Sequence, residues 1–200
     1  MQTEYSDITE RLGTGYSHFL QEYPTLQKRK DFIASLYDAV SREGNSIAGV
    51  DSVYGEGASE WWIKVMLIEL FTFVGAMDSV TTFQVKALAS RIRKTYHYIT
   101  PDELTYFFYA FSLGDYGRMY SGRTVNPQDV LIALKEFSEQ LFESRLEYEK
   151  KKAEEKQEKE REDSRRNAVS FDQWKKIRNL GDDYQNPLLR AVSEINKHKK

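Results

Sequence analysis

The sequence predicts an all-α protein: a compact helical bundle, then a long, highly charged projecting helix and short C-terminal helices. Three observations support this. No segment alternates apolar and polar residues as a half-buried strand does. Several segments repeat apolar residues every three or four positions. Two segments start with a capping residue followed by proline, at Thr100-Pro101 and Asn126-Pro127. We expect the bundle over residues 1–142, the charged helical extension over 143–166 and a basic C-terminal segment over 167–200.

The first part of the chain predicts two short amphipathic helices, over residues 9–23 and 26–40, separated by Pro24. The second helix has apolar residues at helical spacing, namely Phe32, Leu36 and Val40. Residues 41–59 are rich in Gly and Ser and predict a long irregular connection.

The next helix, over residues 59–77, is apolar almost all round, which is typical of the centre of a bundle. Ser59 is the expected N-cap, and Gly75 and Asp78 are expected to end the helix. Glu69 lies inside this apolar segment. We expect it to make a buried polar contact, with Lys64, Arg91 and Arg93 as candidate partners.

A further helix is expected to start at Thr81 or Thr82. Its apolar stripe consists of Val85, Leu88, Ile92 and Tyr96. The other face is basic and carries Lys86, Arg91, Arg93 and Lys94. Such a face is either a solvated surface or a binding surface for an acidic partner or nucleic acid.

The two proline-capped helices have clear apolar faces. Their expected core residues are Leu104, Phe107, Phe108 and Phe111 in the first, and Val130, Leu134, Phe137 and Leu141 in the second. Beyond Phe142 the stripe fades into a run of charged, strongly helix-forming residues. We expect this run to continue as a solvated rod, reaching roughly 60 Å from Pro127 at about 1.5 Å per residue. A flexible charged linker is the alternative.

The turn between these helices contains Gly117, Gly122, Arg123 and Thr124. This differs from the phosphate-loop pattern G-x-x-x-x-G-K-[ST] at one position, where Arg123 replaces the lysine. A phosphate loop follows a buried strand, whereas a helix is expected here, so we interpret the segment as a helix–helix turn. Gly114 is the expected left-handed C-cap. The residues that could hold a phosphate or an acidic side chain are Tyr116, Arg118, Tyr120 and Arg123.

The C-terminal segment is basic, with nine Lys/Arg and four Asp/Glu over residues 165–200, against 20 Lys/Arg and 27 Asp/Glu in residues 1–164. It contains a small apolar face flanked by cations, formed by Phe171, Trp174, Lys175, Lys176, Ile177 and Arg178. Such a face either lays into a groove of another protein or folds back on its own domain.

The composition excludes several classes of site. The chain has no Cys, and its three His are far apart in sequence, so we expect neither a metal site nor a catalytic cluster. The longest apolar stretch, 61–77, is interrupted by charges and is short for a membrane span. We therefore expect a soluble protein of the cytoplasm, without a cofactor, a membrane partner or enzymatic activity.

Residues 61–145 resemble a family of uncharacterised all-helical proteins of phages and mobile elements of gut bacteria. The most specific shared motif is G-x-Y-G-x-x-Y, formed by Gly114, Tyr116, Gly117 and Tyr120. The resemblance implies a bacterial host and no enzymatic activity. By analogy with the helicase loaders and replisome organisers that phages carry, it suggests an accessory role in DNA replication.

Two functions therefore stand as hypotheses. The first is a binding adaptor that contacts a replisome protein, with DNA as a further candidate partner. The second is a structural or assembly protein, such as a virion or scaffold component, which forms homo-oligomers through its helices.

Overall fold

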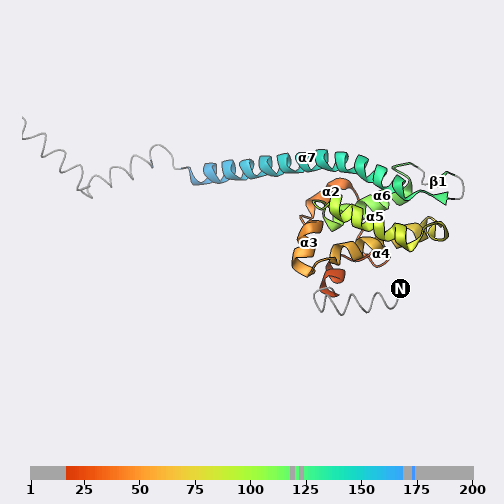
Figure 1. Ribbon diagram of the computed structural model, residues 1–200. Coiled ribbons are helices and arrows are strands. Elements are labelled where there is room, and N and C mark those ends of the chain that lie inside the picture. Colours follow the sequence, from red (N-terminus) through yellow and green to blue (C-terminus); the bar gives the residue numbers. More distant parts are fainter. Residues whose placement is uncertain (1–16, 118–119, 122–123, 169–172, 174–200) are drawn as a thin grey trace, which may run out of the picture. The chain divides into compact units, whose positions relative to one another are not determined.

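The computed structural model describes residues 17–117, 120–121, 124–168 and 173. It confirms the all-α class (Figure 1). The elements with defined bounds are α2 (Leu36–Ser41), α3 (Ile47–Tyr54), α4 (Ala58–Phe73), the 3₁₀ helix η1 (Met77–Ser79), α5 (Thr82–Thr95), α6 (Pro101–Leu113), β1 (Tyr120–Ser121), β2 (Thr124–Val125) and α7 (Pro127–Asn167). The chain divides into two units, residues 1–150 and 151–200.

The expected absence of strands is wrong at one place. The turn between α6 and α7 contains the two-residue strands β1 and β2, which pair antiparallel. A strand of two residues is too short to show an alternating pattern in the sequence. The hairpin is not a parallel sheet that could support a phosphate loop.

The first predicted helix is present where the structure describes it, since residues 17–22 are helical. The prediction of a helix over 26–40 is wrong for most of its length, because only α2 forms. The Ser35 side chain accepts a hydrogen bond from the backbone N–H of Asp38 and caps α2 at that point. Ahead of it, Ile33 is buried and Phe32 is exposed. Phe32 therefore does not belong to the core stripe expected for it.

The irregular connection predicted over 41–59 contains the helix α3. Ser46 caps it by accepting a hydrogen bond from the backbone N–H of Gly49. The backbone N–H groups of Ile47 and Ala48 have no partner inside the helix. They donate instead to the carbonyls of Ile99 and His97, at 2.8 and 3.0 Å. Long-range backbone partners thus satisfy the start of a helix that its Gly-rich sequence hardly indicates.

Helix α4 starts two residues earlier than the expected N-cap implies: its first helical residue is Ala58, and Gly57, in a left-handed conformation, is its N-cap. Ser59 is not the N-cap but a buried residue inside the helix, and its N–H donates to the Asp51 carboxylate at 3.0 Å. At the other end Gly75 has φ 70°, which confirms it as the residue that breaks the helix.

The predicted starts of α5, α6 and α7 are confirmed. Thr81 with Gln84, and Thr100 with Glu103, form complete capping boxes. The Asn126 side chain accepts a hydrogen bond from the N–H of Gln128 at the start of α7. Gly114 ends α6 in the expected left-handed conformation, with φ 92°.

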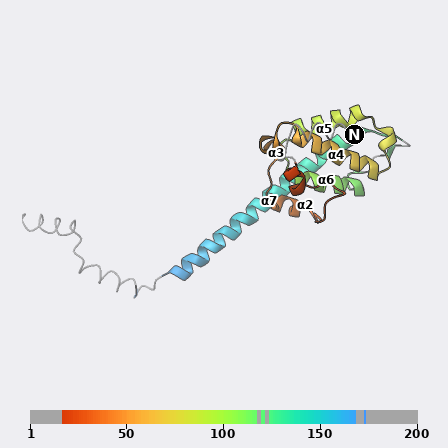
Figure 2. The ribbon, with the colours of Figure 1, turned by 90° about the horizontal axis from the view of Figure 1, so that it is seen from below.

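The core of the first unit gathers around α4, which lies beside α5 in both views (Figures 1 and 2). Trp62 is fully buried, and its indole N–H donates to the Tyr23 carbonyl at 3.0 Å. All the core residues expected on α5, α6 and α7 are buried. The sequence periodicity therefore identified the inward faces of these three helices.

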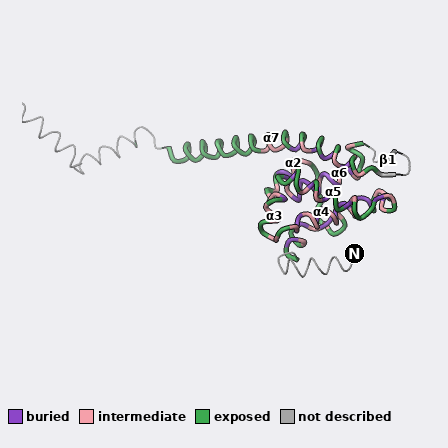
Figure 3. The backbone as a smooth tube through the Cα atoms, viewed as in Figure 1, coloured by how far each residue is buried: buried purple, intermediate pink, exposed green. Residues whose placement is uncertain are grey.

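Helix α7 contributes to this core only through its N-terminal part. Leu141 is its last fully buried residue, and the half-buried Tyr148 is the last one that packs against the core. Every residue from 151 to 167 is exposed (Figure 3). The charged run is helical up to Asn167, as expected, rather than an irregular linker.

Truncation after Ser164 is expected to leave the stability of the first unit unchanged within about 0.5 kcal/mol, because it removes no buried residue that the structure describes. Urea denaturation followed by circular dichroism measures this directly. Loss of cooperative unfolding in the truncated protein would show that the C-terminal residues are part of the core.

Candidate functional site

A half-enclosed groove of about 650 Å³ lies among the described residues of the first unit. Three walls bound it: residues 17–28, helix α4, and the segment from η1 into α5. Its apolar lining includes Leu20, Trp61, Val65, Ile68, Val80 and Val85. We call it the α4–α5 groove.

The groove explains why α4 is apolar on all sides. One side of the helix, including Trp62, Met66 and Leu70, is fully buried in the core. The opposite side, with Trp61 and Ile68, is only half-buried and lines the groove. The all-round apolar pattern therefore serves two surfaces, one of which is accessible.

The charges of the groove are mostly positive. Each wall contributes one lysine, namely Lys28, Lys64 and Lys86, against a single carboxylate, Glu69. Glu69 accepts a hydrogen bond from the backbone N–H of Gln27 at 3.2 Å. This contact replaces the side-chain partners that were expected for Glu69.

Thr25 adds an unsatisfied polar group to the groove. It lines the groove and is 5% exposed, and its Oγ1 has no hydrogen-bond partner among the described residues. A buried hydroxyl without a partner costs free energy, and this oxygen has almost no accessible surface of its own.

The expected basic face of α5 is divided by the structure. Arg91 and Lys94 are exposed, but Arg93 is held in an ion pair. Its Nε donates to the Asp51 carboxylate at 2.6 Å, and this hydrogen bond raises the pKa of Arg93 above its ordinary value. Arg93 therefore links α5 to α3, while Lys86, Arg91 and Lys94 remain at the surface; we call these three residues the α5 basic face.

Tyr116 of the predicted turn site packs against the core. Its ring contacts those of Phe107 and Phe137, and its hydroxyl donates to the Gln140 side chain at 3.0 Å. Burial raises the pKa of Tyr116 to about 12. Tyr116 therefore packs the turn against the bundle.

The remaining predicted site residues cannot be placed. Arg118, Arg123 and the side chain of Tyr120 lie outside the described residues, as do Phe171, Trp174, Lys175, Lys176, Ile177 and Arg178.

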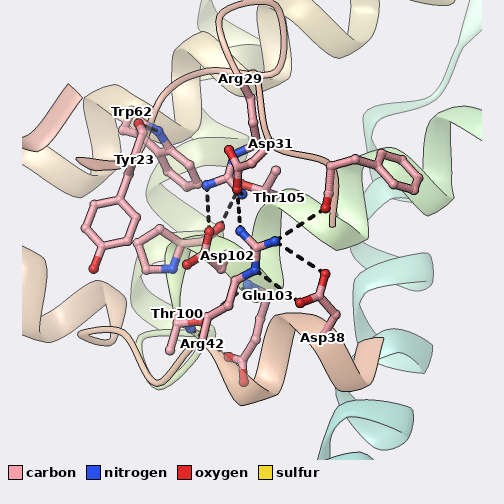
Figure 4. Close-up of polar contacts among 12 residues, drawn as sticks. Tyr23, Arg29, Asp31, Asp38, Arg42, Trp62, Thr100, Asp102, Glu103 and Thr105 are labelled. Carbon is pink, nitrogen blue, oxygen red and sulfur yellow. Dashed lines mark hydrogen bonds and ion pairs between the residues drawn. The ribbon is translucent and has the colours of Figure 1, made fainter. Parts of the chain in front are cut away.

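An ion-pair cluster, not expected from the sequence, joins the segment before α2 to the start of α6 (Figure 4). Its Arg29–Asp102 pair is buried, whereas Asp31 is exposed. Arg29, whose side chain is 2% exposed, donates through Nη2 to the Asp102 carboxylate at 2.6 Å. Arg42 bonds both Asp31 and Asp38. We call these five residues the Arg29 cluster.

The carboxylates that Arg42 binds are stabilised in their charged forms. Hydrogen bonding from Arg42 lowers the pKa of Asp31. For Asp38, burial opposes ionisation, but hydrogen bonds from the Ala34 N–H and from Arg42 outweigh it and lower the pKa. The cluster thus resembles a structural ion-pair network more than an acid–base site, whose acid is kept protonated near neutral pH.

No group of three or more His, Asp or Glu side chains suited to a metal ion occurs in the part of the chain that the structure describes. None of the described helices is long and apolar enough to cross a membrane. Comparison with protein-family models, curated proteins and solved structures found no match.

Proposed function

We propose that this protein is a non-enzymatic binding adaptor of a phage or mobile element, an accessory factor in DNA replication. In this role it contacts a replisome protein and, through the α5 basic face, DNA. The observation that carries the proposal is the composition of α5, which contains four Lys/Arg and no Asp or Glu. The surrounding chain, residues 1–164, is acidic overall, so this helix stands out as a local positive surface.

The residues around the α5 basic face are suited to binding single-stranded DNA. Phe83 is exposed on the same helix, three residues before Lys86. Phe83 and Arg91, two turns apart, both line a shallow hollow between α5 and the start of α7. An exposed aromatic ring next to cations is the usual arrangement for stacking an unpaired base while the cations contact the phosphates. The proposed nucleic-acid ligand is therefore single-stranded DNA.

The test is fluorescence anisotropy with a labelled oligo-dT strand at several salt concentrations. The triple variant Lys86→Glu, Arg91→Glu, Lys94→Glu is expected to bind at least about tenfold more weakly, with a salt slope smaller by about 2. A matched triple variant, Lys30→Glu, Lys135→Glu, Lys156→Glu, changes the same net charge at exposed positions elsewhere. Equal losses in both variants would exclude a specific role for α5.

The second function, a homo-oligomeric scaffold, is supported by α7. Its exposed apolar residues Ile132, Phe142 and Leu146 are not covered by the described chain. Two measurements separate the proposals. Size exclusion with light scattering detects the stable homo-oligomer that a scaffold forms, and such a scaffold would show no DNA affinity in the anisotropy assay. A pull-down from host lysate detects the replisome protein, such as a helicase, that an adaptor binds.

A further inference from the structure

We infer that the α4–α5 groove is a binding site for an anionic amphiphile, a small molecule with an apolar body and a carboxylate or phosphate head. This inference shares one residue, Lys86, with the proposed DNA-binding face of α5, and the variants that test it leave Lys86 unchanged. It rests on the volume, the lining and the charges of the groove.

The size and the shape of the groove fit a small ligand. Its volume of about 650 Å³ lies inside the range of roughly 300–1,000 Å³ that small-molecule sites occupy. Walls from three separate segments surround it, so an apolar body would be covered from several sides. A partner helix needs instead a furrow that is open along several turns.

The apolar lining of the groove favours the binding of a ligand's apolar body. Trp61, Val65 and Ile68 lie along one side of α4 and are half-buried. Covering their remaining apolar surface would stabilise the complex, because apolar surface is removed from water.

The charges select the head group. Lys28, Lys64 and Lys86 come from three different walls, and the only carboxylate in the lining, Glu69, already accepts the Gln27 N–H. An anionic head is therefore attracted by a lysine on each wall, whereas a cationic head is repelled by the same lysines.

The experiment uses isothermal titration calorimetry on the full chain with three probes of equal tail length: dodecanoate, dodecyl phosphate and dodecyltrimethylammonium, each below its micelle concentration. Both anions are expected to bind with one site per chain and at least tenfold tighter than the cation. The stronger of the two anions shows whether the site prefers a carboxylate or a phosphate.

Two variants test the location. Lys28→Glu with Lys64→Glu is expected to weaken anion binding at least tenfold, and Ile68→Trp to block all three probes by filling the groove. Lys135→Glu with Lys156→Glu makes the same change of charge outside the lining and is expected to keep wild-type affinity. Circular dichroism confirms that each variant is folded.

Three results would overturn the inference. The first is equal affinity for the anions and the cation, which would mean non-specific apolar binding. The second is anion binding that neither groove variant alters. The third is an acidic amphipathic peptide that binds through Lys28 and Lys64 while dodecanoate and dodecyl phosphate do not.

Discussion

Replacing Asp102 by Ala is expected to lower the free energy of unfolding by about 3–5 kcal/mol, the usual cost of removing one partner of a buried ion pair. Asp102 accepts the hydrogen bond from Arg29 Nη2, and the Arg29 side chain is 2% exposed. Arg29 Nε and Nη1 have no hydrogen-bond partner among the described residues, and Asp31 lies 3.7 Å from Nη1. The variant would therefore leave a buried guanidinium with little compensation.

Urea denaturation measures this loss, and two controls define its cause. Asp115→Ala removes an exposed aspartate and is expected to change stability by no more than about 0.5 kcal/mol. Arg29→Met combined with Asp102→Ala removes both charges, and is expected to recover much of the loss because no charge is left buried. If the double variant is as unstable as Asp102→Ala, the cost comes from packing rather than from the unpaired charge.

The features that could be predicted from the sequence depend on residues close together in the chain. The capping box of Thr100 and Glu103 spans four residues, and the apolar faces of α5, α6 and α7 repeat every three or four. Such signals need no knowledge of the fold, because the interacting groups are already neighbours in the sequence.

The features that were missed depend on distant partners. Arg29 and Asp102 are 73 residues apart, and Arg93 and Asp51 are 42 apart. Nothing in the sequence separates Arg93, which is held in an ion pair, from the exposed Arg91 and Lys94. The α4–α5 groove could not be predicted for the same reason, because its three walls come from separate segments of the chain.

Phe107→Ala is the second change with a large expected effect, a loss of about 3–5 kcal/mol in the free energy of unfolding. Phe107 is fully buried, and its ring centroid lies 5.3 Å from that of Phe137 on α7 and 5.6 Å from that of Tyr116 in the turn. Removing its ring leaves a cavity where α6, the turn and α7 meet. Urea denaturation with an unchanged m-value would identify the loss as one of packing in the native state.

Phe142→Ala is the matched control, because this phenylalanine is 64% exposed on α7; its expected change is at most about 0.5 kcal/mol. A loss below 1 kcal/mol for Phe107→Ala would contradict the assignment of Phe107 to the centre of the α6–α7 contact.

The contact between the Phe107 and Tyr116 rings also affects the pKa of Tyr116. Because burial raises its pKa to about 12, its neutral form is favoured in the folded protein, and its contribution to stability is lost as pH rises above about 10. Phe107→Ala opens this site to water, so the pKa of Tyr116 is expected to fall toward 10. Absorbance titration of the Phe107→Ala protein, with and without Tyr116→Phe, isolates this tyrosine from the other 12 of the chain's 13. A pKa that stays near 12 would mean that the turn is held by contacts other than the Phe107 ring.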